Sequence, residues 1–424
     1  MVEESNVERD SQAHVQEDSA SDYRRVPVLR FRGFTYAWER RKLGEVYGSI
    51  GNAFVGTATP YYVEYGHFYL ESNNVKDGQI NRNSEIFIND DFYEKQKDKL
   101  LHAGDMVMVQ SGHVGHAAVI TEELDNTAAH ALIMFRNPKE EIEPYFLNYE
   151  YQTDKAKKKI ENITIGNTIK HILASDMQEF VVDVPKHEEQ QVIASYYRTL
   201  DRLVALHQRK LHALHTIKKA LLEKMFPTPG SDIPEIRFQG FTETWKQQRL
   251  GEFFLESDER SSTMEILSVS VANGIYPASE SDRDTNPGAS LASYKVVRKG
   301  DIVYNSMRMW QGAVGSSIYD GIVSPAYVVA RPAVELDSSC FGYLLKQPEM
   351  LYRYLCDSQG NSKDTQTLRF SRFAEIKAEI PPTLDEQQAI STCLGTLDHL
   401  VTLYQHKLNK LHNIKKALLE KMFV

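Results

Sequence analysis

The chain has 424 residues, about three times the length of a typical domain, so two or three domains are expected. Its composition, with 42% apolar and 25% charged residues, suits a globular protein with more than one core, and the net charge of −9 disfavours a whole-surface nucleic-acid binder while permitting a local basic groove. The sequence contains no long apolar run and no signal-peptide pattern, which favours a cytoplasmic protein without a membrane span. Three cysteines (Cys340, Cys356 and Cys393) without metal-ligand spacing argue against a disulfide framework or a zinc site.

The chain begins with an acidic tail and continues into a β-rich module. Residues 1–26 carry seven acidic residues and three arginines with almost no apolar periodicity, so we expect a disordered tail. Residues 27–184 contain short β-rich runs, such as 105–110, that are separated by Gly, Asn and Asp. Strands and loops should therefore dominate this module and the related module in the second half of the chain, with some helix near 146–159 and 343–357.

Residues 185–227 predict one long helix. Apolar residues alternate at steps of four and three, with His207 and Lys218 as interruptions. These apolar positions are Ile193, Tyr197, Leu200, Val204, Leu211, Leu214, Leu221 and Met225. Such a run is typical of a coiled-coil seam. A pair of helices in separate globular cores remains an alternative, but core helices usually present a broader apolar stripe.

The second half of the chain repeats the first. After a linker at 228–233, residues 234–252 repeat 27–45 at an offset of 207, and residues 385–423 repeat 188–226 at an offset of 197. The chain is therefore divided into modules at 27–184 and 234–381 and long helices at 185–227 and 382–424. Lys415 is the only interruption of the second helical seam. The two modules diverge in sequence, whereas the two helices are nearly identical.

The repeat predicts an α+β protein in which two mixed, β-rich globular modules are separated by two long helices. A helix of about 38 residues is roughly 57 Å long, so the second helix must run back along the first if their seams pack together. The result is an antiparallel coiled coil with pseudo-twofold symmetry. Two similar modules on a twofold rod are the geometry of a protein that reads two DNA half-sites, and their divergence favours two different half-sites.

Surface positions on the two helices also match, which an apolar seam alone does not require. The matched positions are Lys219, Glu223 and Lys224, with Lys416, Glu420 and Lys421 as their counterparts. Two copies of one partner protein, one on each symmetry-related face, would explain the match. Recent duplication of the helix is the alternative.

The motifs resemble those of the specificity subunit of a type I restriction-modification system. They are R-F-x-G-F-T-x-x-W followed by L-G-E, the LSVS run at 267–270, the G-D strands, the E-x-Q-x-x-I helix start and KKALLEKMF. The resemblance covers nearly everything after residue 26. It implies two target recognition domains, two modification subunits bound to the coiled coil, restriction subunits joined through them, and a bipartite asymmetric target in double-stranded DNA. The family places S-adenosylmethionine in the modification subunit and ATP with Mg²⁺ in the restriction subunit, and it implies no cofactor in this chain.

Motifs for catalysis are missing from the sequence. There is no phosphate-binding G-x-x-x-x-G-K-[ST] loop, and Asn137-Pro and Asn286-Pro lack the second proline and aromatic residue of an adenine methyltransferase. Glu375-Ile-Lys377 has no suitable upstream acid to complete a nuclease site. His113 and His116 are three residues apart without further ligands, so they are interpreted as polar loop residues and not as a metal site. We therefore expect no catalytic residue in this chain.

Candidate DNA-reading residues lie in loops of the two modules. In the resembling family, loops after the G-D strand belong to the recognition face, which selects 305–311 and its counterpart at 110–115. Asn and Gln can pair with adenine and Arg with guanine, while Trp can stack, and the Lys and hydroxyl groups of a second pair of segments suit phosphate contacts. The candidates are Gln110, Ser111, His113, Lys157, Lys158, Asn167 and Lys170 in the first module, and Asn305, Ser306, Arg308, Trp310, Gln311, Gln359, Asn361 and Lys363 in the second.

Trp38 and Trp245 recur at the same place in both copies, and they are interpreted as core residues because base-reading positions should differ between modules.

The leading hypothesis is a non-catalytic, sequence-specific DNA-binding subunit that positions modification and restriction subunits. A coiled-coil scaffold that has lost DNA binding is the alternative, and a self-sufficient enzyme is disfavoured by the missing motifs. The bases recognised, the spacer length and the ability of the assembled complex to cleave DNA do not follow from the sequence.

Overall fold

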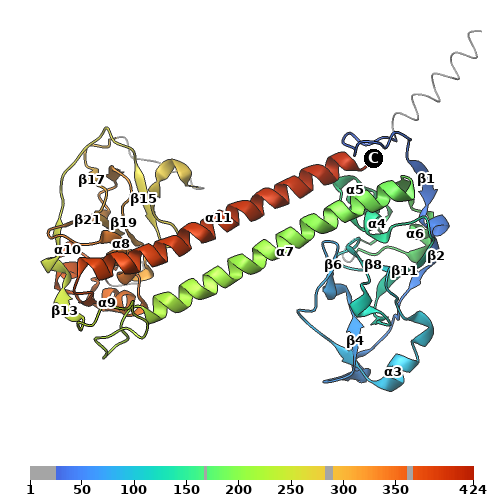
Figure 1. The fold of residues 1–424 in the computed structure, drawn as a ribbon, viewed down its shortest axis with the longest axis horizontal. Helices are drawn as coiled ribbons and strands as arrows, with labels where there is room; N and C mark the ends of the chain where they lie inside the picture. The colour runs from blue at the N-terminus through green and yellow to red at the C-terminus, as the bar shows by residue number, and fades with distance from the viewer. Residues whose placement is uncertain (1–24, 167–169, 282–289, 361–365) are drawn as a thin grey trace, which may run out of the picture. The chain divides into compact units, whose positions relative to one another are not determined.

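The computed structural model describes residues 25–166, 170–281, 290–360 and 366–424, and the chain divides into two compact units (Figure 1). Unit 1 comprises residues 1–207 with 407–424, and unit 2 comprises residues 208–406. Each unit thus contains one module and a segment of each long helix. Most of the predicted acidic tail, residues 1–24, lies outside the described residues.

The central sheet of unit 1 has four antiparallel strands in the order β2-β11-β8-β9. These strands are β2 (Tyr47–Asn52), β8 (Met106–Val109), β9 (Ala117–Val119) and β11 (Leu132–Pro138). All four residues of β8 are buried, as expected of an apolar central strand covered on both faces. The first strand, β1 (Glu39–Lys42), pairs with the last, β12 (Val181–Val184), so the beginning of the module lies beside its end.

Unit 1 also contains a smaller second sheet, which has no equivalent four-stranded sheet among the described residues of unit 2. Its order is β10-β4-β7-β3, with β10 parallel to β4. The remaining short strands and helices of this part are β3 (Tyr62–Val63), β4 (His67–Leu70), β5 (Val75–Lys76), β6 (Gln79–Ile80), β7 (Phe87–Ile88), β10 (Ala128–Ala129), α2 (Leu43–Val46) and α3 (Asp90–Glu94).

Unit 2 repeats the central sheet with the order β14-β21-β18-β19 and the first-to-last pairing of β13 with β22. Two separate antiparallel pairs, β15-β16 and β17-β20, complete its described strands. The bounds are β13 (Lys246–Arg249), β14 (Phe254–Glu256), β15 (Leu267–Ser270), β16 (Gly274–Pro277), β17 (Lys295–Val297), β18 (Ile302–Asn305), β19 (Val314–Ser316), β20 (Gly321–Val323), β21 (Tyr327–Pro332) and β22 (Lys377–Ile380).

Three short helices follow the central sheet in each unit. In unit 1 they are α4 (Pro144–Glu150), α5 (Asp154–Ile163) and α6 (Ala174–Glu179), and in unit 2 they are α8 (Ser338–Leu344), α9 (Pro348–Asp357) and α10 (Phe370–Glu375). The helices predicted near 146–159 and 343–357 are therefore each divided in two. The break in unit 1 follows from Thr153, whose side chain accepts a hydrogen bond from the Ala156 N–H and so begins α5.

The two long helices are α7 (His187–Lys224) and α11 (Leu384–Met422), and each is unbroken. Their predicted seam positions are all buried or half-buried, which confirms the coiled-coil seam. Within unit 2, Lys210 lies over the ring of Tyr404 and Lys218 pairs with Asp398, so one helix segment runs opposite to the other. The α+β class, the doubled modules and the long helices are thus confirmed.

The core of each unit explains the repeated Trp and Phe. In unit 1, Trp38 is 1% exposed and meets Phe423 edge-on at 6.1 Å between ring centroids. In unit 2, Trp245 meets Phe226 in the same way at 6.0 Å. Because each phenylalanine directly follows the repeated Lys-Met at the end of a long-helix repeat, the R-F-x-G-F-T-x-x-W and KKALLEKMF motifs form one packing unit. The interpretation of both tryptophans as core residues is confirmed.

Candidate nucleic-acid interface

An ion pair fixes the start of each module against the start of a long helix. In unit 1, Arg30 donates from Nε and Nη2 to the two carboxylate oxygens of Glu189, at 2.7 and 2.6 Å. Arg237 and Glu386 form the same pair in unit 2. The frame that carries the loops is therefore built in the same way in both units.

A buried aspartate in the Gly-Asp turn then leads into the central strand that carries each predicted reading loop. Asp105 accepts hydrogen bonds from the backbone N–H groups of His102 (2.8 Å) and Asn137 (2.9 Å). Burial raises the pKa of Asp105, and these two hydrogen bonds oppose the rise. The equivalent Asp301 accepts from the Arg298 N–H at 2.8 Å. Both aspartates hold a turn, so they are structural residues of the loop.

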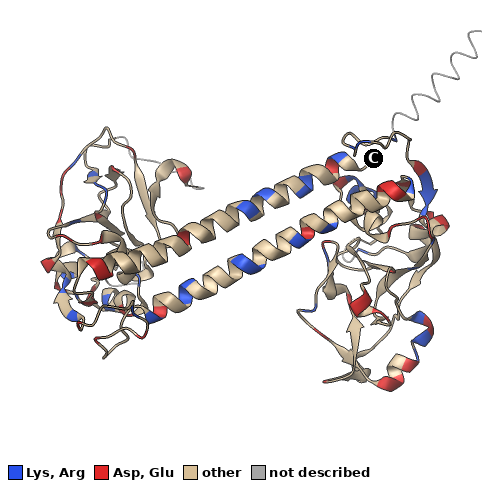
Figure 2. Cartoon of the chain, in the orientation of Figure 1, with Lys and Arg blue, Asp and Glu red and all other residues tan. Residues whose placement is uncertain are grey.

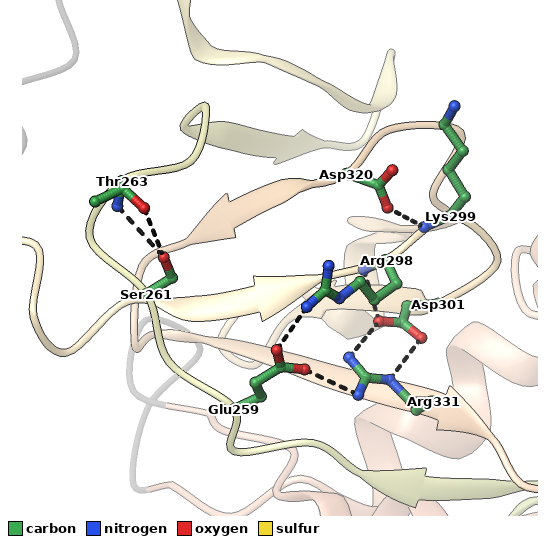
Figure 3. Close-up of polar contacts among 8 residues, drawn as sticks. All are labelled: Glu259, Ser261, Thr263, Arg298, Lys299, Asp301, Asp320 and Arg331. Atoms are coloured by element: carbon green, nitrogen blue, oxygen red, sulfur yellow. Dashed lines mark hydrogen bonds and ion pairs between the residues drawn. The ribbon is translucent and has the colours of Figure 1, made fainter.

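In unit 2, the same aspartate belongs to a charged cluster at the start of β18 (Figure 3). Arg331 donates to both oxygens of Asp301 at 3.3 and 3.2 Å. The Glu259 carboxylate accepts hydrogen bonds from Arg298 at 2.6 Å and from Arg331 at 3.1 Å. These two arginines hold the pKa of Glu259 below its usual range. The two guanidinium groups are thus neutralised by acids of the same unit. The predicted loop begins at the other end of β18, about 13 Å away for a four-residue strand.

The reading loop of unit 2 presents two unpaired polar side chains. Among the described residues, the Arg308 guanidinium and the Gln311 amide are exposed and have no side-chain partner. Asn305 instead accepts a hydrogen bond from the Met307 N–H at 3.0 Å, and Ser306 donates to the Ala326 carbonyl at 2.8 Å. These contacts shape the loop and leave Arg308 and Gln311 available for an external acceptor or donor.

Trp310, for which stacking on DNA stays a prediction, has contacts within unit 2. Its ring is half-buried and packs against the core of unit 2, and its Nε1 donates to the Met307 carbonyl at 3.2 Å. The neighbouring Met309 is fully buried, so the short 3-10 turn of residues 309–311 is anchored in the core. Trp310 therefore supports the loop from below.

The second predicted segment of unit 2 lies beside the first. Gln359 and Thr367 exchange two backbone hydrogen bonds, and the next residue, Leu368, donates its N–H to the Ser306 carbonyl at 2.8 Å. Two segments more than 50 residues apart in the sequence are therefore brought together. Of the candidates on this segment, Asn361 and Lys363 lie outside the described residues.

Unit 1 brings its two segments together in the same way. The Gln110 carbonyl accepts the Ile172 N–H at 3.1 Å, and the Lys170 carbonyl accepts the Gly112 N–H at 3.1 Å. Ser111 also forms an isolated backbone bridge with His171. The Lys170 ammonium group pairs with Glu161 at 2.8 Å, so its contact with a phosphate stays a prediction, and Asn167 lies outside the described residues.

Basic side chains gather beside the unit 1 loop. Burial lowers the pKa of His116, Asp77 opposes this effect, and the positive charges of His113, Lys157 and Lys76 lower the pKa further. The Asp77 N–H donates to His116 Nδ1 at 3.3 Å. Lys76 was missed by the sequence reasoning, because the Lys-Asp-Gly turn indicates a hairpin but does not reveal its position next to the loop at 110–116.

Helix α5 contains four lysines, whereas its counterpart α9 contains a single basic residue, Arg353; Figure 2 draws the Lys and Arg of the chain in blue. Lys157 and Lys158 are exposed and have no ion-pair partner among the described residues. In α9, by contrast, Arg353 binds Glu349 at 3.2 Å and also donates to the Lys377 carbonyl. The two units therefore present different charges next to equivalent loops.

The matched residues on the long helices are less uniform than the sequence suggests. Lys219 and Glu223 are exposed and lie 3.9 Å apart as an i,i+4 pair, but Lys224 is half-buried and pairs with Glu235 at 2.5 Å. Glu420 is exposed yet accepts the Asp154 N–H at 2.9 Å. Lys416 and Lys421 are exposed. Lys224 and Glu420 thus have partners within their own units.

A second apolar stripe lies outside the seam, and its members are equivalent in the two units. The apolar residues that unit 1 exposes on its long-helix segments include Leu203, Leu206 and Ile414. Unit 2 carries the same residue types at the repeat-related positions Leu400, Leu403 and Ile217, of which Leu400 is half-buried. Exposed apolar residues that recur at equivalent positions of the two units favour a protein-binding surface.

No site for metal-dependent chemistry is found in the described residues. Within 25–166, 170–281, 290–360 and 366–424, no group of three or more His, Cys, Asp and Glu side chains is placed to hold a metal ion. Over the same ranges, no helix is both long and apolar enough to cross a membrane.

Comparisons with known proteins agree with the doubled architecture. A model of the type I restriction modification DNA specificity domain matches residues 36–216 and 242–413, which is more than half of the chain. The chain is similar to the protein of Methanocaldococcus jannaschii named as the MjaX type I restriction enzyme specificity subunit, with 24% identity over 420 residues that cover 90% of this chain and 92% of that protein. It also resembles the MjaVIII specificity subunit of the same organism, with 23% identity over 196 residues and 44% of each chain.

A solved structure shares the fold. The crystal structure of the type I restriction-modification S subunit from M. genitalium matches with a TM-score of 0.61 and 15% identity, covering 94% of this chain and 99% of that one.

Proposed function

Because the chain belongs to the type I restriction-modification DNA specificity family, we propose that it reads a bipartite, asymmetric target in double-stranded DNA, one half-site with each unit. The general role of this family is recognition of a DNA sequence. The observation that carries the finer proposal is the contrast between a common frame and different loops. The Arg–Glu pair, the Gly-Asp turn and the joining of two loop segments recur, whereas loop residues 110–115 and 305–311 differ.

In unit 2, we assign base reading mainly to Arg308 and Gln311. Both side chains are exposed and unpaired in the described structure, and they offer the donor and acceptor groups that guanine and adenine edges require. Asn305, Ser306, Trp310 and Gln359 shape the loop or border it. Asn361 and Lys363 remain candidates by sequence alone.

In unit 1, the basic residues beside the loop suit contacts with the DNA backbone. Lys157 and Lys158 are unpaired on α5, and His113 lies at the same surface. Such contacts position a protein on DNA, while Gln110 and Ser111 on the loop itself are the candidates for base contacts. Lys170 would have to leave Glu161 before it could bind a phosphate.

We further propose that two modification subunits bind, one at each equivalent apolar stripe, and that restriction subunits join through them. The stripes of Leu203, Leu206 and Ile414 and of Leu400, Leu403 and Ile217 are the support for two equal sites. The flanking charged candidates are Lys219, Glu223, Lys224, Lys416, Glu420 and Lys421. In this arrangement, the stripes supply apolar area and the charged residues form the rim.

Catalysis is assigned to the partners. The modification subunit would supply S-adenosylmethionine and take the target adenine out of the duplex, since chemistry on a base requires it to leave the stack. The restriction subunit would supply ATP and Mg²⁺. This chain contributes recognition and position.

Reconstitution from purified subunits tests the proposal. The chain alone should neither methylate nor cut DNA, and addition of the modification subunit should give methylation of one duplex selected from a random library. Light scattering should give two modification subunits per chain. A complex without salt-dependent affinity for one duplex above competitor DNA would instead support a protein-bridging scaffold, and a one-to-one complex would refute the two-site assembly.

A further inference from the structure

Two lysines occupy seam positions of the long helices, where leucine or another apolar residue is usual. They are Lys218 and Lys415, and they are equivalent under the helix repeat. In unit 1, Lys415 binds Asp201, with 2.6 Å between Nζ and Oδ1. In unit 2, Lys218 binds Asp398, which is the repeat equivalent of Asp201. The interruptions of the seam are thus two equivalent ion pairs.

A tyrosine from the module completes each pair. The Tyr149 hydroxyl donates to the second oxygen of Asp201 at 2.8 Å, and the Tyr343 hydroxyl donates to the second oxygen of Asp398 at 2.7 Å. Each aspartate therefore joins three elements: its own long helix, the opposite helix segment in that unit, and the helix of the module, α4 or α8. We name these groups the 201 cluster (Asp201, Lys415 and Tyr149) and the 398 cluster (Asp398, Lys218 and Tyr343).

The 201 cluster is the more enclosed of the two. The Lys415 and Asp201 side chains are 15% and 16% exposed, compared with 27% and 40% for Lys218 and Asp398. The Lys415 ammonium also lies 5.3 Å from the centre of the Tyr149 ring. Burial and the neighbouring Asp201 raise the pKa of Tyr149, so the phenol keeps the proton that it donates.

Such a cluster can select one helix register. A leucine seam repeats every seven residues, so a helix pair displaced by one heptad still buries leucine against leucine. In the displaced register, however, the lysine would face apolar residues and the aspartate would lose its cation. A buried ion pair adds little net stability over apolar packing, but the loss of one partner is strongly unfavourable. The cost of the displaced register therefore comes from the charges.

We propose that the 201 and 398 clusters are positioning residues that fix the register of the helix segments in each unit and the attachment of the module to them. The inference rests on the proposed function in one respect, which is that the helix register sets the spacing between the two DNA half-sites. Register itself is a property of the chain and can be measured without DNA.

The test replaces the ion pair of unit 1 by leucines. In the full chain, with Cys356→Ser and Cys393→Ala as background, spin labels are placed at the exposed positions Arg202 and Asn413 of unit 1. The parent should give one narrow distance. The double variant Asp201→Leu/Lys415→Leu should keep or raise the melting temperature but give a second, longer distance population, because one heptad displaces one helix along the other by about 10 Å. A single, unchanged distance would overturn the proposal.

A matched control and a rescue complete the design. Glu94→Ala/Lys97→Ala removes an exposed ion pair of unit 1 outside the long helices and should leave the distance unchanged. The exchange variant Asp201→Lys/Lys415→Asp keeps one ion pair and should therefore give a single distance. If the leucine variant does not fold, this exchange variant tests the proposal by itself. Two distance populations in the exchange variant would refute the claim that the charges fix the register. In cells, the leucine variant should methylate targets with more than one spacer. Absence of all methylation in cells that contain both the parent chain and the modification subunit would count against the proposed function, whereas the distances would still test the register.

Discussion

Arg237 binds Glu386 through two hydrogen bonds, from Nε to Oε1 at 2.6 Å and from Nη2 to Oε2 at 2.8 Å. Glu386 is 1% exposed, and it also accepts the Nε1–H of Trp245 at 3.2 Å. The pair therefore joins the repeated Arg-Phe motif, the repeated tryptophan and the first turn of α11. Its equivalent, Arg30 with Glu189, occupies the same place in unit 1.

Replacing Arg30 by alanine should destabilise unit 1 by about 3–5 kcal/mol, because it leaves the buried Glu189 carboxylate without its cation. Arg30→Lys should recover only part of the loss, since an ammonium group cannot form the two-pronged contact. Denaturant unfolding followed by tryptophan fluorescence measures the change. The exposed neighbour Arg32 provides the control, and Arg32→Ala should remain within about 0.5 kcal/mol of the parent. Equal effects at Arg30 and Arg32 would contradict this account of the pair.

Glu150 should make unit 1 less stable as the pH rises. Burial raises its pKa to about 8, and within the described residues its Oε2 has no hydrogen-bond partner. The unfolded chain releases this proton near pH 4.5, the ordinary pKa of a glutamate, whereas the folded chain keeps it to about pH 8, so the free energy of unfolding falls between these pH values. Each pKa unit is worth about 1.4 kcal/mol, so the loss should amount to several kcal/mol.

Glu150→Leu should remove most of this pH dependence, because a leucine side chain cannot ionise. The fold should accept this leucine, since Leu344 occupies the equivalent last position of α8. The measurement consists of melting curves of the full chain between pH 4.5 and 8, together with the rate of hydrogen exchange of the α4 backbone, which reports on unit 1. The exposed Glu161→Gln serves as the control for a general loss of negative charge. A pH slope that survives in Glu150→Leu would assign the effect to another group.

Replacing Arg308 and Gln311 by alanine should relax one half-site while leaving the other intact. A lost side-chain contact to a base edge is worth about 1–3 kcal/mol of discrimination, so the motif should degrade at the positions read by unit 2. Methylated-base mapping with the double variant gives the result directly. Met307→Ala, at an exposed residue of the same loop, is the matched control. An unchanged motif in the double variant would remove this loop from the recognition surface.

Replacing Lys157 and Lys158 by alanine should weaken binding to all duplexes by a similar factor. Phosphate contacts carry no sequence information, and each one lost should reduce the slope of log affinity against log salt by about one. Fluorescence anisotropy at several salt concentrations, with the target and an unrelated duplex, measures both effects. Lys97→Ala with Lys99→Ala removes two lysines elsewhere in unit 1 and should leave the slope unchanged. A selective loss for the target would indicate base contacts instead.

Much of the architecture could be predicted from the sequence, because it depends on local patterns. The repeat offsets define the modules, and the alternating apolar steps define the seam of α7 and α11. Trp38 and Trp245 could be assigned to cores because they recur where the loops do not. The division of the shorter helices was missed because it depends on single caps such as Thr153.

The contacts of the candidate residues could not be predicted, because they join residues that are distant in sequence. Lys415 was only an interruption of a pattern, and its partner Asp201 lies 214 positions earlier. In the same way, the sequence gives no sign that Lys170 has a partner, but the fold brings its ammonium group to Glu161, which lies nine residues earlier. The sequence also does not show that the Trp310 ring packs against the core of unit 2.

The most direct test of the central claim is a genome-wide map of methylated adenines in cells that contain the modification subunit, with and without the gene for this chain. We expect one bipartite motif with a methylated adenine in each half when the gene is present and no methylation at that motif when it is deleted. A motif that persists after deletion, or a motif without a spacer, would contradict the claim that this chain selects the target through two recognition units.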